Sequence, residues 1–386
     1  MTVKTAARMR LIQPFYVMAL LARARELEAA GRSIIHMEIG EPDFVTPQPL
    51  IDAGIRALQD GRTHYTPAAG LWALREKIAG FYQTRYGITV EPERVVVTPG
   101  ASAALQLVLA VLVNAGDQVL LADPGYPCNR NFVHLLNGEP VAVPVNAGSG
   151  YQPAPQQISE YWTDRTRALL VASPSNPTGT LLDDHTLREY HTITGRNGGS
   201  LIVDEIYHGL TYDGPAQTAL AVSDDIFVIN SFSKYFGMTG WRLGWLIAPR
   251  EVIPDIEKLA QNLFLAAPTL AQYAALSAFD DEVIAILDAR RDEFRSRRDY
   301  LLPALRDIGF GIPVAPAGAF YLYADCSRFT DDSYGFAERL LEEAGVAVTP
   351  GIDFGSNQPE QHVRFAYTTS LENLQEGMRR LAERPC

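Results

Sequence analysis

The stretch SFSKYFGMTGWRLGW, at residues 231–245, places Lys234 eight positions before Arg242, with two glycines between them. The segment DDIFVIN, at residues 224–230, has the apolar character of a buried strand and ends where the serines begin. Lys234 therefore follows a strand end, which is where α/β folds place their chemistry. A lysine considered alone is more often a solvated surface residue, so its role depends on the rest of the chain.

The middle of the chain alternates apolar strands with helical segments. Helices are predicted at residues 101–113 and 183–198, between runs rich in Val, Ile and Leu. Such runs indicate a mostly parallel sheet that is covered by helices on both faces, so we expect an α/β fold. The further predicted strands, each with the loop that follows it, are at residues 94–100, 118–127, 167–179, 200–207 and 240–249.

The pattern changes beyond about residue 280. A long charged helix is predicted at residues 288–309, and it precedes the strand AFYLYADC, a helix, the strand HVRFAY and a last helix. We expect a smaller α+β domain that is joined by an N-terminal helix at residues 17–31. The predicted domains are an N-terminal segment (1–45) packed on the small domain, a large domain (46–284) and a small C-terminal domain (285–386).

Composition excludes several classes of protein. The 386 residues carry a net charge of −12, which leaves no basic face to neutralise nucleic acid phosphates. The longest apolar runs are too short to span a bilayer, and residues 1–10 lack the apolar core of a signal peptide. Three cysteines form neither a disulfide framework nor a metal-ligand spacing. We expect a cytoplasmic protein without a metal.

Polar groups follow the predicted strands, and in a parallel sheet these ends converge on one crevice. They are Gly100 to Ser102, Asp123 to Tyr126, Ser175 and Asn176, Asp204 to Tyr207, and Ser231 to Lys234. A helix N-terminus suits a phosphate, and Arg242 with serine hydroxyls adds donors. The complementary ligand has a phosphate, a carbonyl for the amine and a basic nitrogen for the carboxylate. Pyridoxal 5′-phosphate has all three.

Six blocks carry a resemblance to a known family. The sequence resembles the class I (class I/II) aminotransferases, which are fold-type I pyridoxal-phosphate enzymes related to aspartate aminotransferases. The resemblance implies a large domain with a seven-stranded type of sheet between helices, and a smaller α+β domain. The blocks are IGEPDF (39–44), YTPAAGLWALR (65–75), SPSNPTG (173–179), DEIY (204–207), SFSKYFGMTGWRLGW (231–245) and HVRFAY (362–367).

The resemblance implies a role for each catalytic residue. Lys234 resembles the lysine that holds the cofactor as a Schiff base and then transfers protons. Asp204 resembles the carboxylate that keeps the pyridinium nitrogen protonated, although a lone aspartate there is commonly a cap or turn residue. Tyr207 and Asn176 resemble the pair that hydrogen-bonds the ring phenolate, and Asn176 is also assigned to the substrate site. A structural tyrosine and a turn asparagine are the alternatives.

The phosphate ligands come from three segments. Arg242, Ser231, Ser102 and the backbone of Ala101 resemble the phosphate cradle of the family, where the fork geometry of arginine suits an anion. Tyr65 resembles a tyrosine that reaches the cofactor phosphate of the neighbouring subunit. The resemblance therefore implies a homodimer with shared active sites.

The remaining ligands surround the ring and the substrate. Tyr126 lies where family members stack an aromatic ring on the cofactor, although a core aromatic is a competing interpretation. Arg364, with the backbone of Gly40 beside it, resembles the arginine that binds the α-carboxylate of the substrate. A surface ion pair is the alternative for Arg364. Cis peptide bonds before Pro174 and Pro177, as in relatives, are left open.

The predicted activity is ping-pong transfer of an amino group from an L-amino acid to a 2-oxo acid. The nearest alternative is another fold-type I enzyme, such as a cysteine-conjugate β-lyase, a cyclase or a decarboxylase, because Lys234 would be shared. An aminotransferase-like transcription regulator lacks support, since no basic DNA-binding region precedes residue 18. A nicotinamide dehydrogenase is disfavoured because no G-x-G-x-x-G follows a strand.

The amino donor is predicted from the residues near Pro14. Phe15, Tyr16 and Val17 offer an aromatic and apolar wall. Ser102 stands in the turn where relatives that favour aspartate have a lysine. A distal carboxylate without a cation is costly to bury, so neutral or apolar donors are favoured over aspartate. Arg130 or Arg10 could still supply the cation.

Overall fold

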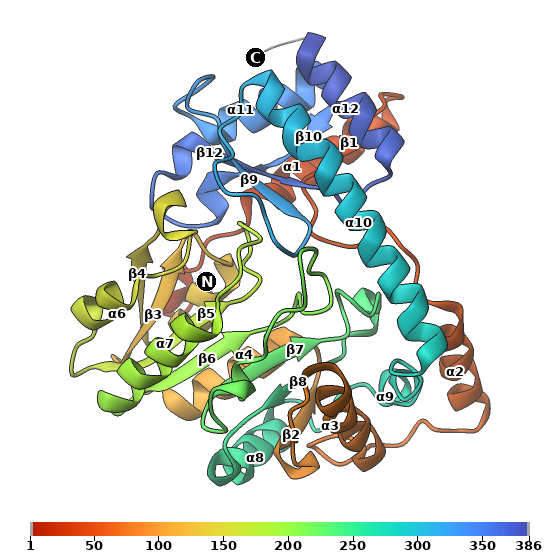
Figure 1. Ribbon diagram of the computed structural model, residues 1–386, viewed down its shortest axis with the longest axis vertical. Coiled ribbons are helices and arrows are strands. Elements are labelled where there is room, and N and C mark those ends of the chain that lie inside the picture. The colour runs from red at the N-terminus through yellow and green to blue at the C-terminus, as the bar shows by residue number, and fades with distance from the viewer. Residues whose placement is uncertain (1–2, 384–386) are drawn as a thin grey trace.

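A seven-stranded sheet forms the centre of the larger part of the protein in the computed structural model, which describes residues 3–383 (Figure 1). Its strands are β2 (Val95–Thr98), β3 (Gln118–Asp123), β4 (Glu139–Pro144), β5 (Thr166–Ala172), β6 (Ser200–Asp204), β7 (Phe227–Ser231) and β8 (Gly244–Ile247). The strand order is β2-β8-β7-β6-β5-β3-β4. β8 runs antiparallel to both of its neighbours, whereas the other pairs are parallel.

Alternating residues of the strands pack into two separate hydrophobic cores. Val95 and Val97 of β2 belong to one core and Val96 belongs to the other, because successive side chains of a strand point to opposite faces. The helices around the sheet are α2 (Gln48–Gln59), α3 (Trp72–Tyr86), α4 (Ala101–Leu112), α5 (Pro127–Leu135), α6 (Pro155–Tyr161), α7 (Asp184–Arg196), α8 (Ile253–Leu263) and α9 (Thr269–Ala275). α4, α5 and α8 cover the Val96 face, and buried residues of α2, α3, α6, α7 and α9 belong to the core of the opposite face.

The smaller part, at the top of Figure 1, contains two small sheets and four helices. Its elements are α1 (Tyr16–Ala29), β1 (Ile35–His36), α10 (Asp281–Ile308), β9 (Tyr321–Asp325), α11 (Ser333–Arg339), β10 (Val346–Ala347), β11 (Thr349–Pro350), β12 (His362–Ala366) and α12 (Leu371–Glu383). β12 lies between β11 and β9 in an antiparallel sheet, and β1 pairs with β10. α1 contacts β10 and β11, and α10 runs along one side of the molecule past both parts (Figure 1).

The predicted fold class is confirmed, with some local differences. α10 begins at Asp281 instead of at residue 288, so the expected boundary between residues 284 and 285 falls inside a helix, and the domain limits stay a prediction. The edge strand β4 was not predicted. The peptide bonds before Pro174 and Pro177 are cis, and so is the unpredicted bond before Pro124.

A group of hydrogen bonds joins the end of β3 in the large sheet to the loop at residues 355–357 of the small part. The carboxylate of Asp123, at the end of β3, accepts hydrogen bonds from the backbone N–H of Ser356 at 2.9 Å and from its hydroxyl at 2.7 Å. The Nδ2 group of Asn357 donates to the carbonyls of Asp123 and Val145. A Cβ atom at Gly355 would lie 1.6 Å from Oδ1 of Asp123, so this approach requires glycine. We call this contact the Asp123 clasp.

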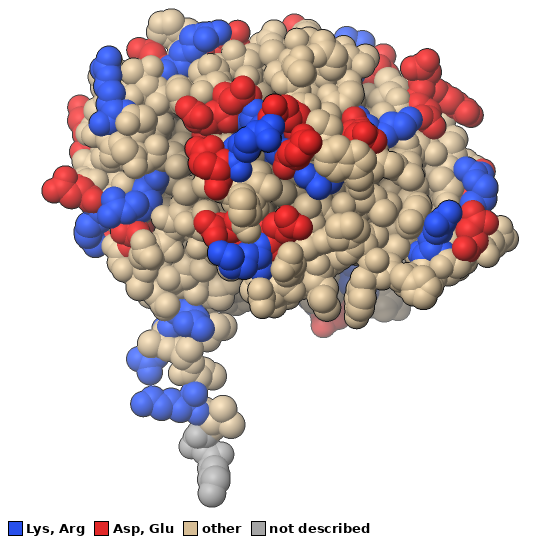
Figure 2. Space-filling view, turned by 90° about the horizontal axis from the view of Figure 1, so that it is seen from below, with Lys and Arg blue, Asp and Glu red and all other residues tan. Residues whose placement is uncertain are grey.

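Charges of both signs are interspersed on the face shown in Figure 2, where the N-terminal stretch projects from the body. Among residues 3–383, no helix combines the length and the apolar character needed to cross a membrane. The same residues contain no group of three or more His, Cys, Asp or Glu side chains placed to hold a metal ion.

Candidate active site

The carboxyl ends of the central strands open into a cavity of about 210 Å³ that reaches the small part of the protein. Lys234 follows β7 and Asp204 ends β6, as predicted from the strand pattern. The predicted residues on its wall are Gly40, Ala101, Ser102, Tyr126, Asn176, Asp204, Tyr207, Lys234 and Arg364. The structure thus brings together nine of the predicted residues from segments far apart in the chain.

The amine of Lys234 is buried among charged groups of both signs. Its Nζ donates a hydrogen bond to the carbonyl of Gly40 at 2.6 Å and lies 5.7 Å from the centre of the Phe320 ring. Burial lowers the pKa of Lys234 from 10.5 to about 8. The charged groups that also act on this pKa are Glu41 and Asp204, which raise it, and Arg364 and Arg242, which lower it. With this pKa a fraction of the amine is neutral near physiological pH, and the neutral amine can act as a nucleophile or base.

Asp204 is a buried carboxylate with little compensation from its surroundings. Its Oδ1 accepts a hydrogen bond from the backbone N–H of Ile206 at 3.1 Å. Burial raises the pKa of Asp204 to about 7, against the lowering effects of this hydrogen bond and of Lys234. A cationic nitrogen placed beside this carboxylate would stabilise its charged form.

Arg364 points its guanidinium at the cavity from β12. Nη1 donates to Oδ1 of Asn176 at 2.9 Å, and Nη2 donates to the carbonyl of Glu38 at 2.8 Å. The Tyr321 and Phe354 rings lie 4.2 Å and 4.9 Å from Cζ of Arg364. Its buried Nε has no hydrogen-bond partner among the described residues. Arg364 forms no ion pair with a carboxylate among these residues, although its charge opposes the burial that raises the pKa of Asp353, so it is suited to bind a carboxylate from a ligand.

Tyr207 meets Tyr321 of the small part, and the two hydroxyl oxygens are 2.9 Å apart. Burial raises the pKa of Tyr207 well above its usual value, so the phenol stays protonated and can donate a hydrogen bond. A Cβ at Gly40 would lie 2.0 Å from the Tyr321 hydroxyl, so Gly40 is required for this packing.

The N-terminus of α4 forms an anion cradle with the start of β8. Gly100 has φ 80° and ψ 170°, and a Cβ there would lie 2.5 Å from Nη2 of Arg242. A Cβ at Gly244 would lie 2.9 Å from the backbone nitrogen of Ala101. Both glycines therefore allow the arginine and β8 to approach the helix end, where the first N–H groups lack intrahelical partners.

Ser231 lies next to this cradle, because it pairs with Gly244 at the start of β8, and Ser233 follows it in the chain. The hydroxyl oxygens of Ser231 and Ser233 are 3.0 Å apart, and the backbone N–H of Ser233 donates to Oγ of Ser231. Ser231 and Arg242 do not line the cavity itself. A turn follows β7 and places the hydroxyl of Ser233 beside that of Ser231.

This arrangement fits pyridoxal phosphate. The cradle has the free N–H groups and the arginine that a phosphate needs, and the glycine positions leave no room for side chains there. Across the cavity stand the low-pKa amine of Lys234 and the buried, under-compensated carboxylate of Asp204. These groups complement an aldehyde and a pyridinium nitrogen.

Tyr65 lies away from the cavity, and its residue is 82% exposed. The role predicted for Tyr65 therefore stays a prediction. Arg10 lies in a short exposed helix at residues 7–10.

Several wall residues were missed by the sequence reasoning. Phe15 and Val17 were anticipated, but Tyr321, Thr349, Asp353 and Phe354 of the small part also line the cavity. Only the strand pattern around Tyr321 hinted at its element, and no motif marked the other three. They enter the site because the small part packs over the sheet edge.

Comparison with known proteins places the chain in a family. The family model described as "Aminotransferase class I and II" matches residues 32–381. The chain is 40% identical to a (5-formylfuran-3-yl)methyl phosphate transaminase of Methanocaldococcus jannaschii, and the match covers 96% of both chains. It is 39% identical to a valine–pyruvate aminotransferase of Mycobacterium tuberculosis, again over 96% of both chains.

A solved structure agrees along the whole chain. The aspartate aminotransferase of Thermus thermophilus, in a crystal with maleate, superposes with a TM-score of 0.93 at 35% identity, covering 99% of this chain and 100% of the other. The members of this family use pyridoxal phosphate, which the cavity also fits. The chain belongs to the class I and II aminotransferases and is a pyridoxal-phosphate-dependent enzyme of that family.

Proposed function

We propose that this aminotransferase moves the amino group of an L-amino acid to a 2-oxo acid in two half-reactions that use one cavity. The observation that carries the proposal is the pairing of Lys234 with Arg364 across this cavity. The low-pKa amine is suited to bind the cofactor, and the arginine is suited to hold the α-carboxylate of either substrate. Bound pyridoxal phosphate supplies an electron sink for the charge left at Cα when its proton is removed.

Lys234 is the proposed proton carrier. An amine with a pKa of about 8 can take the proton from Cα of the donor and give one up later in the same cycle. Arg364 and the backbone of Gly40 orient the substrate so that Cα faces this amine. The hydrogen bond between Nζ and the Gly40 carbonyl supports their closeness.

Asp204, Tyr207 and Asn176 are proposed to tune the cofactor. The buried carboxylate of Asp204 stabilises a positive charge on the ring nitrogen, and Tyr207 and Asn176 bind the ring oxygen. Tyr126 packs on the ring face. The proposed phosphate ligands are Ala101, Ser102, Ser231 and Arg242, with Tyr65 of the partner subunit.

The assembly and location follow the same reasoning. We propose a homodimer with shared sites, because Tyr65 is exposed and does not line the cavity of its own chain. The cytoplasm is the proposed location.

The proposed donors are neutral or apolar amino acids. Phe15, Val17, Leu105 and Pro127 give the cavity apolar walls, and Ser102 provides no cation there. The relative named for valine and pyruvate agrees with this preference, whereas the structural neighbour named for aspartate indicates the opposite. The M. jannaschii relative is named for a phosphate-bearing aldehyde, so its acceptor carries an anion at the far end.

A panel of amino donors tests the proposal. Valine, alanine, phenylalanine and aspartate are supplied with pyruvate or 2-oxoglutarate, and the cofactor spectrum and the 2-oxo acid products are measured. We expect a higher kcat/KM for valine or phenylalanine than for aspartate. Faster reaction with aspartate would contradict the donor preference. A cysteine conjugate is added to the panel without a 2-oxo acid, and its sustained conversion to pyruvate, ammonia and a thiol beyond one equivalent per site would indicate β-elimination instead.

A further inference from the structure

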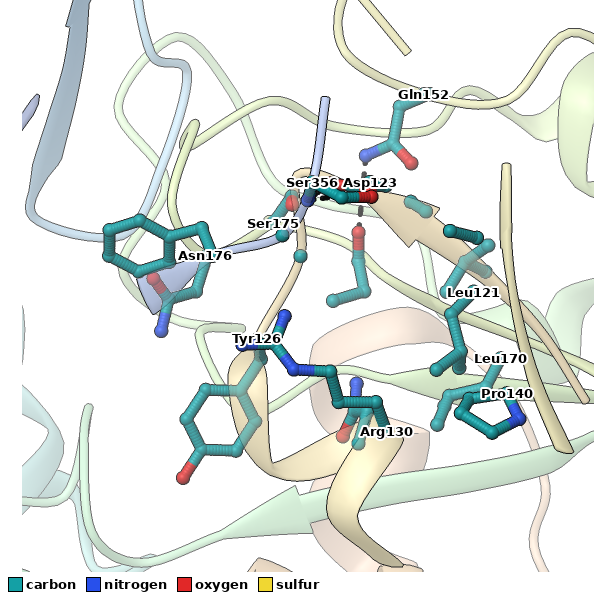
Figure 3. Close-up of a pocket in the computed structure, with 18 residues that line it drawn as sticks. Leu121, Asp123, Tyr126, Arg130, Pro140, Gln152, Leu170, Ser175, Asn176 and Ser356 are labelled. Carbon is teal, nitrogen blue, oxygen red and sulfur yellow. Dashed lines mark hydrogen bonds between the residues drawn. The ribbon is translucent and has the colours of Figure 1, made fainter. Parts of the chain in front are cut away.

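A second cavity of about 260 Å³ adjoins the candidate active site (Figure 3). The two cavities share the wall formed by Tyr126, Ala172, Asn176 and Phe354. The second cavity lies between the carboxyl ends of β3 and β5, the helix α5 and the loop at residues 354–356. A ligand that enters the active site therefore borders this space.

The second cavity has an apolar floor and an unsatisfied polar wall. Leu121, Pro140 and Leu170 form part of the floor. Asn129, only 8% exposed, has a buried Oδ1 that finds no hydrogen-bond partner among the described residues. Buried polar atoms are normally paired, and an amide can present either its oxygen or its nitrogen. The side-chain amide of Asn129 can therefore form a hydrogen bond with a polar group of a ligand in this cavity.

Arg130 supplies a cation to this cavity. It extends from α5 toward Tyr126, which belongs to the shared wall (Figure 3). Its Nη2 donates to the backbone carbonyl of Asp353 at 2.8 Å. Within residues 3–383 its guanidinium forms no ion pair. The carboxylate of Asp353 is near enough for Arg130 to oppose the burial that raises its pKa, but this carboxylate accepts its hydrogen bonds from the N–H groups of Tyr16 and Val17. A partly enclosed guanidinium held only by a carbonyl is suited to bind an anion.

The other charged group that lines this cavity is Asp123. Its carboxylate accepts hydrogen bonds from Ser356 in the Asp123 clasp. This negative charge would repel a second anion nearby. An anionic group is therefore expected near Arg130 and the shared wall, away from Asp123.

We propose that Arg130 binds the anionic group at the far end of a long acceptor substrate whose 2-oxo or aldehyde group reacts at Lys234. This inference rests on the proposed aminotransferase function and names the class of its second substrate. A carboxylate and a phosphate both match the guanidinium fork. Apolar donors and anionic acceptors can then use one active site, because only the acceptor engages Arg130.

Binding to the holoenzyme is the first test. Calorimetry compares glutarate and 3-phosphonopropionate with propionate, which lacks the second anion, on the wild type and on Arg130→Gln. Arg379→Gln is the matched control, since Arg379 is exposed on α12, pairs with Glu376 and Glu383, and lines neither cavity. We expect Arg130→Gln to weaken at least one dianion by about 10- to 100-fold, with little change for propionate. The probe that loses more affinity identifies the anion as carboxylate or phosphate.

The second test is the acceptor half-reaction. We expect the ratio of kcat/KM for 2-oxoglutarate to that for pyruvate to fall about tenfold or more in Arg130→Gln, and Arg130→Lys to restore part of it. If Arg130→Gln does not fold, Arg130→Lys and Arg130→Met carry the same comparison. Equal losses for both acceptors, or unchanged dianion binding, would overturn the proposal.

The two tests separate this proposal from the function on which it rests. If dianion binding depends on Arg130 but no donor yields a 2-oxo acid, the aminotransferase proposal fails and the anion site stands. If transamination proceeds but the affinity for dianions does not depend on Arg130, the anion-site proposal is wrong and the aminotransferase proposal stands.

Discussion

At the scale of single residues, the chemistry of Lys234 follows from its surroundings. Burial brings the pKa of its amine to about 8, so its protonation changes within the usual range of assay pH. The same side chain on the surface would stay charged until near pH 10.4. Only the neutral amine reacts with an aldehyde, so the rate of reaction should report this pKa.

We predict a pH profile for the recombination of apoenzyme with pyridoxal phosphate. Because the pKa is lowered, the neutral fraction of Lys234 rises about tenfold per pH unit below pH 8 and levels off above it. Stopped-flow absorbance from pH 6 to 10 measures the rate. A rate that keeps climbing to pH 10 would show an unperturbed lysine. Lys234→Ala should lose the slow absorbance change, whereas Lys258→Ala, which replaces an exposed lysine, should keep it.

Residue types at strand ends were the part of the site that the sequence could predict. Lys234 and Asp204 follow apolar runs directly, so their positions at the sheet edge are implied by the pattern. Asp353 and Phe354 lie in the small part, whose placement over the sheet depends on tertiary packing. The pairing of Ser231 with Ser233 depends on a turn that local propensity does not specify.

At the scale of elements, the N-terminus of α4 depends on one glycine. The φ of 80° and ψ of 170° at Gly100 are a conformation that side-chain-bearing residues rarely adopt. A Cβ at this position would also displace the Arg242 guanidinium. The cradle geometry therefore depends on Gly100.

We predict that Gly100→Ala destabilises the protein by about 1–3 kcal/mol and weakens cofactor binding. Thermal unfolding and cofactor titration measure the two effects. Gly80→Ala is the matched control, because Gly80 lies inside α3 with open space where its Cβ would be. The control should gain up to about 1 kcal/mol from helix propensity. If the two variants show the same change in stability and in cofactor affinity, the cradle does not depend on Gly100.

The edge strand β4 was not predicted from the sequence pattern, and its composition explains why. β4 was missed because its six residues include two prolines, which argue against a central strand. The structure places β4 at the edge of the sheet, next to β3 alone, where a missing N–H is tolerated. By contrast, β5, β6 and β7 each contain a continuous apolar run, and these strands were predicted.

At the scale of the whole molecule, the proposed dimer can be tested by mixing two damaged subunits. Lys234→Ala removes the reacting amine, and Tyr65→Ala removes a phosphate ligand given to the partner. In a mixed dimer, the site of the Tyr65→Ala subunit keeps its own Lys234 and receives Tyr65 of the partner subunit. We predict that mixing restores about a quarter of wild-type activity at limiting cofactor.

The control for this experiment is the same mixing with Lys234→Ala alone, which offers no intact site. Activity in the first mixture that equals the average of the two variants would contradict shared sites. Light scattering on each sample checks that dimers are present.

The sheet order has a consequence for how the enzyme is made. β2 lies at one edge and pairs only with β8 within the described sheet, although the two strands are separated by residues 99–243. While the ribosome is still producing those residues, β2 and the start of α4 have no neighbouring strand to hold them in place. The phosphate cradle thus closes late in synthesis, so a nascent chain cannot trap its vitamin-derived cofactor before nearly two thirds of it has been translated.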